Sequence, residues 1–153
     1  MNEPHDAAWE FWFTVRKAAA ILERQLEAII AREIGLSLGQ FMILSVTGTA
    51  PAALTQTAIA RELGLTKGTV SRLVESAVTA GWLSVTPDPA SRRSRLIALT
   101  PAGTDLVRRG DRALVAAPLG LYPNANPETA QATVVMLQQF IAAATGDAGC
   151  GLS

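Results

Sequence analysis

Short polar and basic side chains gather in one segment near the middle of the chain. They belong to Thr66, Lys67, Gly68, Thr69, Ser71 and Arg72. Hydroxyls and cations on short or flexible stems are the groups that reach phosphates and base edges of a duplex. Any amphipathic helix also has a solvated polar face, so this segment alone leaves both interpretations open.

A second basic group follows about twenty residues later. Its members are Arg92, Arg93 and Arg95, with no acid among them. We expect a hairpin here, with strands at Trp82–Val85 and Arg95–Leu99, a turn over residues 87–90 and a loop carrying the arginines. Proline lacks the N–H that a ladder needs, so Pro87 and Pro89 predict a mobile, projecting finger. Guanidinium groups at such a tip suit the negative potential of a minor groove, although a solvated hairpin loop is the plain alternative.

The chain offers no catalytic group. His5 lies in an N-terminal arm, where a solvated histidine is far commoner than a catalytic one, and the carboxylates form no converging pair. Cys150 is the single cysteine, which excludes an internal disulfide and a multi-cysteine metal site. We therefore expect no enzyme, no cofactor and no metal.

Two short helices joined by a tight corner would position the first polar segment. Thr55 caps a helix to about Leu63, and Thr66 caps a second helix to about Ala80. Gly64 supplies the positive φ at the corner. The inward positions are Ile59, Ala60, Leu63, Val70, Leu73, Val74 and Ala77. This spacing is that of a helix-turn-helix.

Taken together, LTQTAIARELGLTKGTVSRLVESAVTAGWL and the following TPDPASRRSRLIALTPAG resemble the winged helix-turn-helix of the MarR family of transcription regulators. The resemblance covers residues 54–103 closely. It implies a homodimer that binds double-stranded DNA, with Thr66–Arg72 at a major groove and Arg93 at the wing tip. Two positions depart from the family. Ser91 replaces an acid that usually steadies the wing arginine, and residues 84–86 are uncharged where the family is usually basic.

The remaining segments predict a mainly α protein with a small β-hairpin wing, flanked by dimerisation helices. We expect an N-terminal dimerisation helix in residues 1–34, with a helical pattern over 7–33 that Gly35 ends. The DNA-binding lobe spans 35–100 and includes a helix over 38–47. Residues 101–145 hold the C-terminal dimerisation helices, to about 117 and over 127–144, and 146–153 form a disordered tail. The apolar stripes of the N-terminal helix and of the C-terminal helices are too wide to bury within one chain, which predicts a homodimer.

Members of the family often bind small aromatic or amphipathic effectors between the dimerisation helices and the DNA-binding lobe. By resemblance, an effector pocket here would be lined by Trp9, Trp12, Phe13, Phe41, Met42 and Trp82. The same residues also suit a plain hydrophobic core.

Composition agrees with a regulator that binds DNA through one part of its surface. The 153 residues are 49% hydrophobic and have zero net charge, yet residues 61–109 carry eight basic and four acidic side chains. That excess of positive charge lies on the predicted helix-turn-helix and wing. There is no basic-then-apolar leader and no membrane-length apolar run, so we expect a cytoplasmic protein without a membrane partner. Two other classes stay open: a winged-helix protein-interaction module that does not bind DNA, and a small-molecule enzyme built on the helical dimer.

Overall fold

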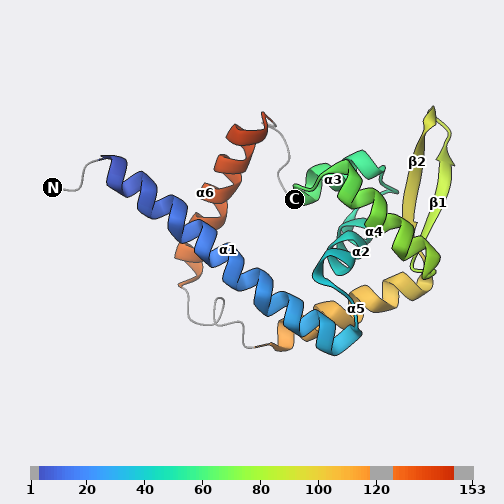
Figure 1. The fold of residues 1–153 in the computed structure, drawn as a ribbon, viewed down its shortest axis with the longest axis horizontal. Helices are drawn as coiled ribbons and strands as arrows, with labels where there is room; N and C mark the ends of the chain where they lie inside the picture. The colour runs from blue at the N-terminus through green and yellow to red at the C-terminus, as the bar shows by residue number, and fades with distance from the viewer. Residues whose placement is uncertain (1–3, 118–125, 147–153) are drawn as a thin grey trace. The chain divides into compact units, whose positions relative to one another are not determined.

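The computed structural model describes residues 4–117 and 126–146, with side chains from residue 7 onward. Its elements are α1 (Pro4–Ile34), α2 (Leu38–Thr49), α3 (Gln56–Leu63), α4 (Lys67–Thr79), β1 (Leu83–Asp88), β2 (Ser91–Leu99), α5 (Pro101–Ala116) and α6 (Pro127–Thr145) (Figure 1). The first seven elements belong to one compact unit, and α6 belongs to a second. The predicted fold class, mainly α with a two-stranded antiparallel wing, is confirmed.

Each short helix begins at the residue that the sequence predicted. Ser37 and Gln40 form a capping box at the start of α2, in which each side chain bonds the other residue's backbone N–H. Thr100 caps α5, and Pro101 occupies its first position, where a missing N–H costs nothing. Two bounds differ slightly from expectation: α1 already begins at Pro4, and α2 continues to Thr49.

One hydrophobic core lies beneath the helix-turn-helix. Phe41 and Ile43 come from α2, Ile59 from α3, Val70 from α4 and Ile97 from β2, and each is at most 2% exposed. These five side chains join four elements into one cluster. Burial of this many large apolar side chains provides the main driving force for folding the lobe.

Two glycines allow α5 to approach the rest of the unit closely. A Cβ atom at Gly110 would overlap the ring of Phe41, and one at Gly103 would overlap the carbonyl oxygen of Trp82. Both glycines are buried within α5. The close neighbours of these glycines are Phe41 of α2 and Trp82, the residue before β1.

The long helix α1 is buried only near its C-terminal end. There Ile29 and Ile30 are buried, and Arg109 Nη2 of α5 donates a hydrogen bond to the carbonyl of Glu33 at 3.3 Å. Figure 1 shows this end of α1 beside α5. The Glu27 carboxylate accepts a hydrogen bond from the backbone N–H of Leu38 at 2.6 Å, which joins α1 to the first turn of α2.

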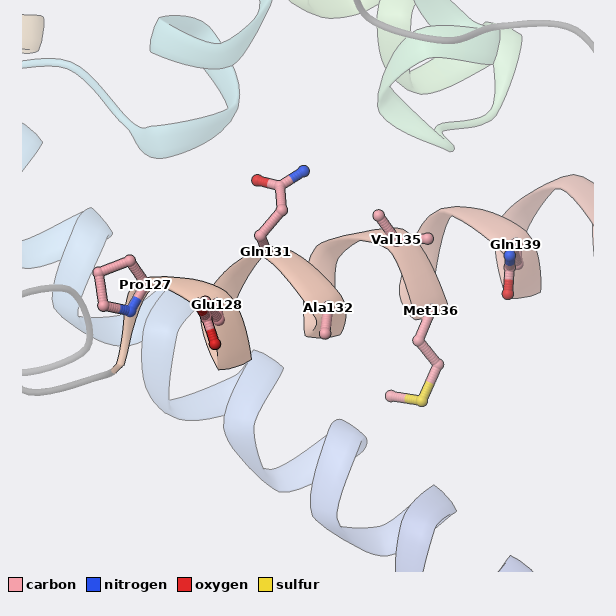
Figure 2. A pocket seen from close by; sticks show the side chains of 7 residues that line it. All are labelled: Pro127, Glu128, Gln131, Ala132, Val135, Met136 and Gln139. Carbon is pink, nitrogen blue, oxygen red and sulfur yellow. The ribbon is translucent and has the colours of Figure 1, made fainter.

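Helix α6 has no buried residue among those that the structure describes. Its exposed apolar side chains are Val134, Val135, Met136, Phe140 and Ile141. Figure 2 shows an open pocket along this helix, with Gln131 and Val135 on one side and Ala132 and Met136 on the other. As expected from its sequence, α6 carries more apolar surface than it can cover alone.

Within the described ranges, no single helix combines the length and apolar composition needed to cross a membrane. The bent pair Ala7–Ile34 and Leu38–Thr49, at 82° to each other, meets these criteria only when taken together. The predicted tail beyond Gly146 and the connection over 118–125 lie outside the described residues.

Candidate nucleic-acid interface

The corner between α3 and α4 is built as predicted. Thr55 caps α3 by accepting a hydrogen bond from the N–H of Ala58 at 3.2 Å. Gly64 ends α3 with a φ of +62°, a conformation that costs little only for a residue without Cβ. Val70 fills the crossing and is fully buried. The core-facing side of α4 is therefore fixed, and its opposite face points to solvent.

The first turn of α4 uses two of the predicted site residues for its own stability. The Thr66 hydroxyl accepts a hydrogen bond from the N–H of Thr69 at 3.2 Å, and the two hydroxyl oxygens lie 2.9 Å apart. This is an N-cap, which satisfies a backbone donor that the helix cannot. Thr66 thus begins the helix in addition to lying on the candidate face.

The outward face of α4 is open. Lys67, Gly68 and Arg72 are exposed, and a Cβ at Gly68 would meet no atom within 4 Å. Thr69 and Ser71 are half-buried at the edges of this face. Within residues 4–117 and 126–146, Lys67 and Arg72 make no ion pair with a carboxylate. Both cations are therefore available to an outside anion such as a phosphate.

The wing is more regular than its prolines suggested. The predicted strand bounds were wrong, because β1 continues through Pro87 to Asp88 and β2 already begins at Ser91. Pro87 pairs with Arg95 and Asp88 with Ser91, so the register shifts between Pro87 and Asp88. The ladder is therefore irregular next to Pro87 but does not end there. At the tip, the Asp88 carboxylate accepts a hydrogen bond from the N–H of Ala90 at 2.9 Å.

The three wing arginines consequently lie on β2 rather than in a loop. Arg92 and Arg93 fall in the stretch where the register shifts, and Arg95 stands opposite Pro87. All three are exposed. None of them pairs with a carboxylate within the described residues. A bulge that carries exposed cations leaves their side chains free to turn toward a groove.

Ser91, which stands where the family usually has an acid, contacts a neighbouring serine. Its Oγ accepts a hydrogen bond from the Ser94 hydroxyl at 3.2 Å. The base of the wing has a different anchor. Leu54 and Ile97 exchange both backbone hydrogen bonds, at 3.0 and 2.7 Å. This bridge holds the hairpin to the segment before α3, and nothing in the local sequence signalled it.

The residues expected to line an effector pocket fall into separate groups. Trp9, Trp12 and Phe13 contact one another near the start of α1, with ring centroids 5.2–5.7 Å apart, and all three are exposed. Phe41 is a core residue at 2% exposure, whereas Met42 beside it on α2 is exposed. The half-buried Trp82 packs against the core that contains Phe41. The structure thus places three aromatic rings together and the other three residues elsewhere in the unit.

Two polar contacts of the lobe were not anticipated. Ser71 donates a hydrogen bond to the carboxylate of Glu75 at 3.2 Å, one turn further along α4. Gln40 of α2 donates through Nε2 to the Ser76 hydroxyl at 3.4 Å. The i, i+4 spacing of Ser71 and Glu75 is a local pattern from which the first contact could have been predicted, whereas no local pattern predicts the second. Among the described residues, no group of three or more His, Cys, Asp or Glu side chains is placed to hold a metal ion.

A helix-turn-helix, a cationic hairpin beside it and an open polar face on the second helix define a winged helix-turn-helix protein. Comparison with known proteins narrows this class. The sequence profile of the MarR family matches residues 34–94. The uncharacterized protein Rv2011c of Mycobacterium tuberculosis is 30% identical over 129 residues, which cover 84% of this chain and 88% of the relative.

Solved structures agree in fold. Sco3205, a MarR family transcriptional regulator from Streptomyces coelicolor in complex with DNA, matches with a TM-score of 0.79 at 19% identity, covering 94% of this chain and 89% of that one. CouR from Rhodococcus jostii RHA1, bound to p-coumaroyl-CoA, matches with a TM-score of 0.78 at 20% identity, covering 86% and 91%. The chain belongs to the MarR family. It is a transcription regulator and not an enzyme.

Proposed function

We propose that the protein is a homodimeric repressor that binds a palindromic operator through α4 and the wing. The observation that carries this proposal is the set of unpaired cations on one lobe. Lys67 and Arg72 on α4 and the three arginines of β2 are exposed and make no ion pair among the described residues. Cations without internal partners are free to neutralise phosphates and release counterions.

The exposed apolar surface of the terminal helices supports the dimer. On α1, Trp12 is 52% exposed and Phe13 is 57% exposed, and on α6 Phe140 is 56% exposed. Large apolar side chains exposed in this way on each helix mark an interaction site. A second copy would cover it through an isologous contact, in which the same surface of both chains takes part. We therefore assign the segments 1–34 and 101–145 to dimerisation and 35–100 to DNA binding.

The dimer would place two copies of α4 about one helical turn of DNA apart, which is the spacing of half-sites in an inverted repeat. In each lobe, Lys67, Thr69, Ser71 and Arg72 would contact the major groove. Arg92, Arg93 and Arg95 would contact the adjacent minor groove, where the potential is most negative. Thr66 and Gly68 would contribute through their backbone groups at the start of α4. The Thr66 hydroxyl already caps the helix, and Gly68 has no side chain.

The direct test is whether the full chain protects an inverted repeat in the DNA upstream of its own gene. We expect Arg72→Ala to weaken binding to that site by about 1–3 kcal/mol, because a base contact is lost. Arg93→Ala should lower affinity more evenly across sequences, because a contact in the minor groove is less sequence-specific. Arg16→Ala, which removes an exposed charge from α1, serves as the control. Equal binding by wild type, Arg72→Ala and Arg93→Ala at moderate salt would refute the assignment.

We further propose that a small aromatic or amphipathic effector releases the DNA. CouR, which has a similar fold, is bound to p-coumaroyl-CoA in its crystal structure. In this chain the rings of Trp9, Trp12 and Phe13 form an aromatic cluster on α1, within the segment that we assign to dimerisation, so an effector bound there would act beside the dimer contact. An effector that favours one lobe spacing weakens operator binding in proportion to its differential affinity for the two arrangements. A titration of tryptophan fluorescence with phenolic acids tests this, and absence of any saturable change together with unaltered operator binding would refute it.

A protein-interaction module without DNA binding is the second candidate function. It is favoured by the uncharged stretch Ser84–Thr86 on β1 and by Ser91, which bonds Ser94 instead of steadying an arginine. The salt dependence of DNA binding separates the two functions. An operator complex loses affinity steeply as salt rises, because counterions are released on binding, whereas a salt-insensitive association would favour the module.

A further inference from the structure

The outward face of α4 carries one acidic side chain among its cations. Glu75 is exposed and is the only carboxylate between Lys67 and Thr79. Gly68, Arg72 and Glu75 are spaced by four and three residues, so they share one face of the helix. A carboxylate close to a duplex is repelled by phosphates, which makes an acid in this position costly for simple backbone binding.

An ion pair within the described part of the chain does not explain why Glu75 lies on this face. Arg72, three residues before Glu75 on the same face, forms no ion pair with it in the described part of the chain. The contact that Glu75 does make is with Ser71, whose hydroxyl donates to Oε1 at 3.2 Å. This bond orients the carboxylate along α4 and leaves Oε2 without a partner within the described residues.

The surroundings of Glu75 allow a base pair to approach. Gly68 lies two turns earlier on the same face, and a Cβ built there would meet no atom within 4 Å. The lack of a side chain at Gly68 lets the start of α4 sit deep in a groove, which brings the next turns closer to the base edges. Glu75 shares the face of Gly68 and Arg72, so it would face the same groove if α4 enters one along this face.

We propose that Glu75 is a specificity-determining residue that accepts a hydrogen bond from the amino group of a cytosine in the major groove. A carboxylate can only accept hydrogen bonds. In the major groove, cytosine presents its N4 amino group as a donor, with no acceptor beside it on the same base. Adenine presents its N6 amino group beside the N7 acceptor, which suits an amide better than a carboxylate. Ser71 acts as a positioning residue, because it holds the carboxylate in place.

This inference rests on the proposed function, since it requires α4 to enter a major groove. The experiment selects duplexes from a randomised pool with the full-length wild type, Glu75→Ala and Glu75→Gln. Asp105→Asn, an exposed acid of α5 without a hydrogen bond among the described contacts, makes the same change of charge away from α4. Each protein is then titrated with the selected duplex and with duplexes changed at single base pairs.

We expect the wild type to prefer cytosine at one position of each half-site by about tenfold or more. Glu75→Ala should lose that preference while binding unrelated DNA more tightly, because the acceptor and the repulsive charge are both removed. Glu75→Gln should shift the preference toward adenine, because an amide both donates and accepts. Asp105→Asn should select the same sequence as the wild type.

A cytosine preference that survives in Glu75→Ala would overturn the inference. So would a uniform gain in affinity with no change in the selected sequence, since Glu75 would then only repel phosphate. In both cases a sequence selected by the wild type would still support the proposed function. Failure of the wild type to select any sequence would instead defeat the proposed function and this inference together.

Discussion

Replacing Gly110 with alanine should destabilise the protein, although alanine is the better helix former. In a helix interior the exchange of glycine for alanine is worth about 0.8–1.0 kcal/mol in favour of alanine. At Gly110, however, the new methyl group would overlap the Phe41 ring, with two further ring atoms at 2.9 Å. Phe41 is 2% exposed, so its ring has no free space to enter. Overpacking of a filled core costs about 1–3 kcal/mol, and this cost should outweigh the gain in helix propensity.

Because the overlapped ring is buried and has no space to move into, we take the upper end of that range, about 3 kcal/mol, and expect Gly110→Ala to lower the free energy of unfolding by about 2 kcal/mol. Urea denaturation followed by circular dichroism measures this, at one fixed protein concentration because the proposed dimer makes the midpoint concentration-dependent. Gly39→Ala is the matched control, since a Cβ there meets Leu73 at an ordinary 3.5 Å. It should leave stability unchanged or slightly raised.

A double substitution separates overlap from any other effect at Gly110. Phe41→Leu removes the ring edge that the new methyl group would meet, so Gly110→Ala should cost less in that background than in the wild type. If Gly110→Ala proves as stable as the wild type or the Gly39→Ala control, the close approach of α5 and α2 does not limit this position. The packing argument would then be refuted.

Three further substitutions test contacts that join the elements, each by urea denaturation. Gly103→Ala should cost more than Gly110→Ala, because the obstacle is the backbone carbonyl of Trp82, which cannot rotate away as a side chain can; an equal or smaller loss would contradict this. Thr66→Ala should cost about 1 kcal/mol through loss of the N-cap while Thr66→Ser costs little, and equal losses for the two would rule the cap out. Glu27→Ala should destabilise by about 1 kcal/mol, because the N–H of Leu38 loses its charged acceptor. Glu27→Gln retains an acceptor and should recover part of that loss, so equal stability of the two variants would show that the contact contributes little.

The helix boundaries could be predicted because the interactions that set them are local. Thr55, Thr66 and Thr100 each cap a helix by accepting from an N–H three residues later, and the sequence alone places both groups. Gly64 ends α3 for a similarly local reason, its positive φ. Binary patterning likewise predicted Val70 as a buried residue, since its spacing follows the helical period.

The wing was predicted with the wrong bounds because its strands depend on partners elsewhere in the chain. Pro87 argued locally against pairing, yet it lies opposite Arg95 and the ladder continues beyond it to Asp88. The bridge between Leu54 and Ile97, more than forty residues apart, anchors the base of the hairpin. Pairing of this kind adds energy that no local propensity contains.

The sequence alone predicted the class of fold, the capped helices, the polar outward face of α4 and the resemblance to the MarR family. The tertiary structure decided which aromatic residues are core and which are surface. It buried Phe41 against Gly110 and left Trp12 and Phe13 exposed, although all three are large and apolar. It also showed that Glu75 bonds Ser71 and not Arg72. The physical reason is that burial and side-chain partners depend on what other elements bring near a residue, and those neighbours are set only when the whole unit has folded.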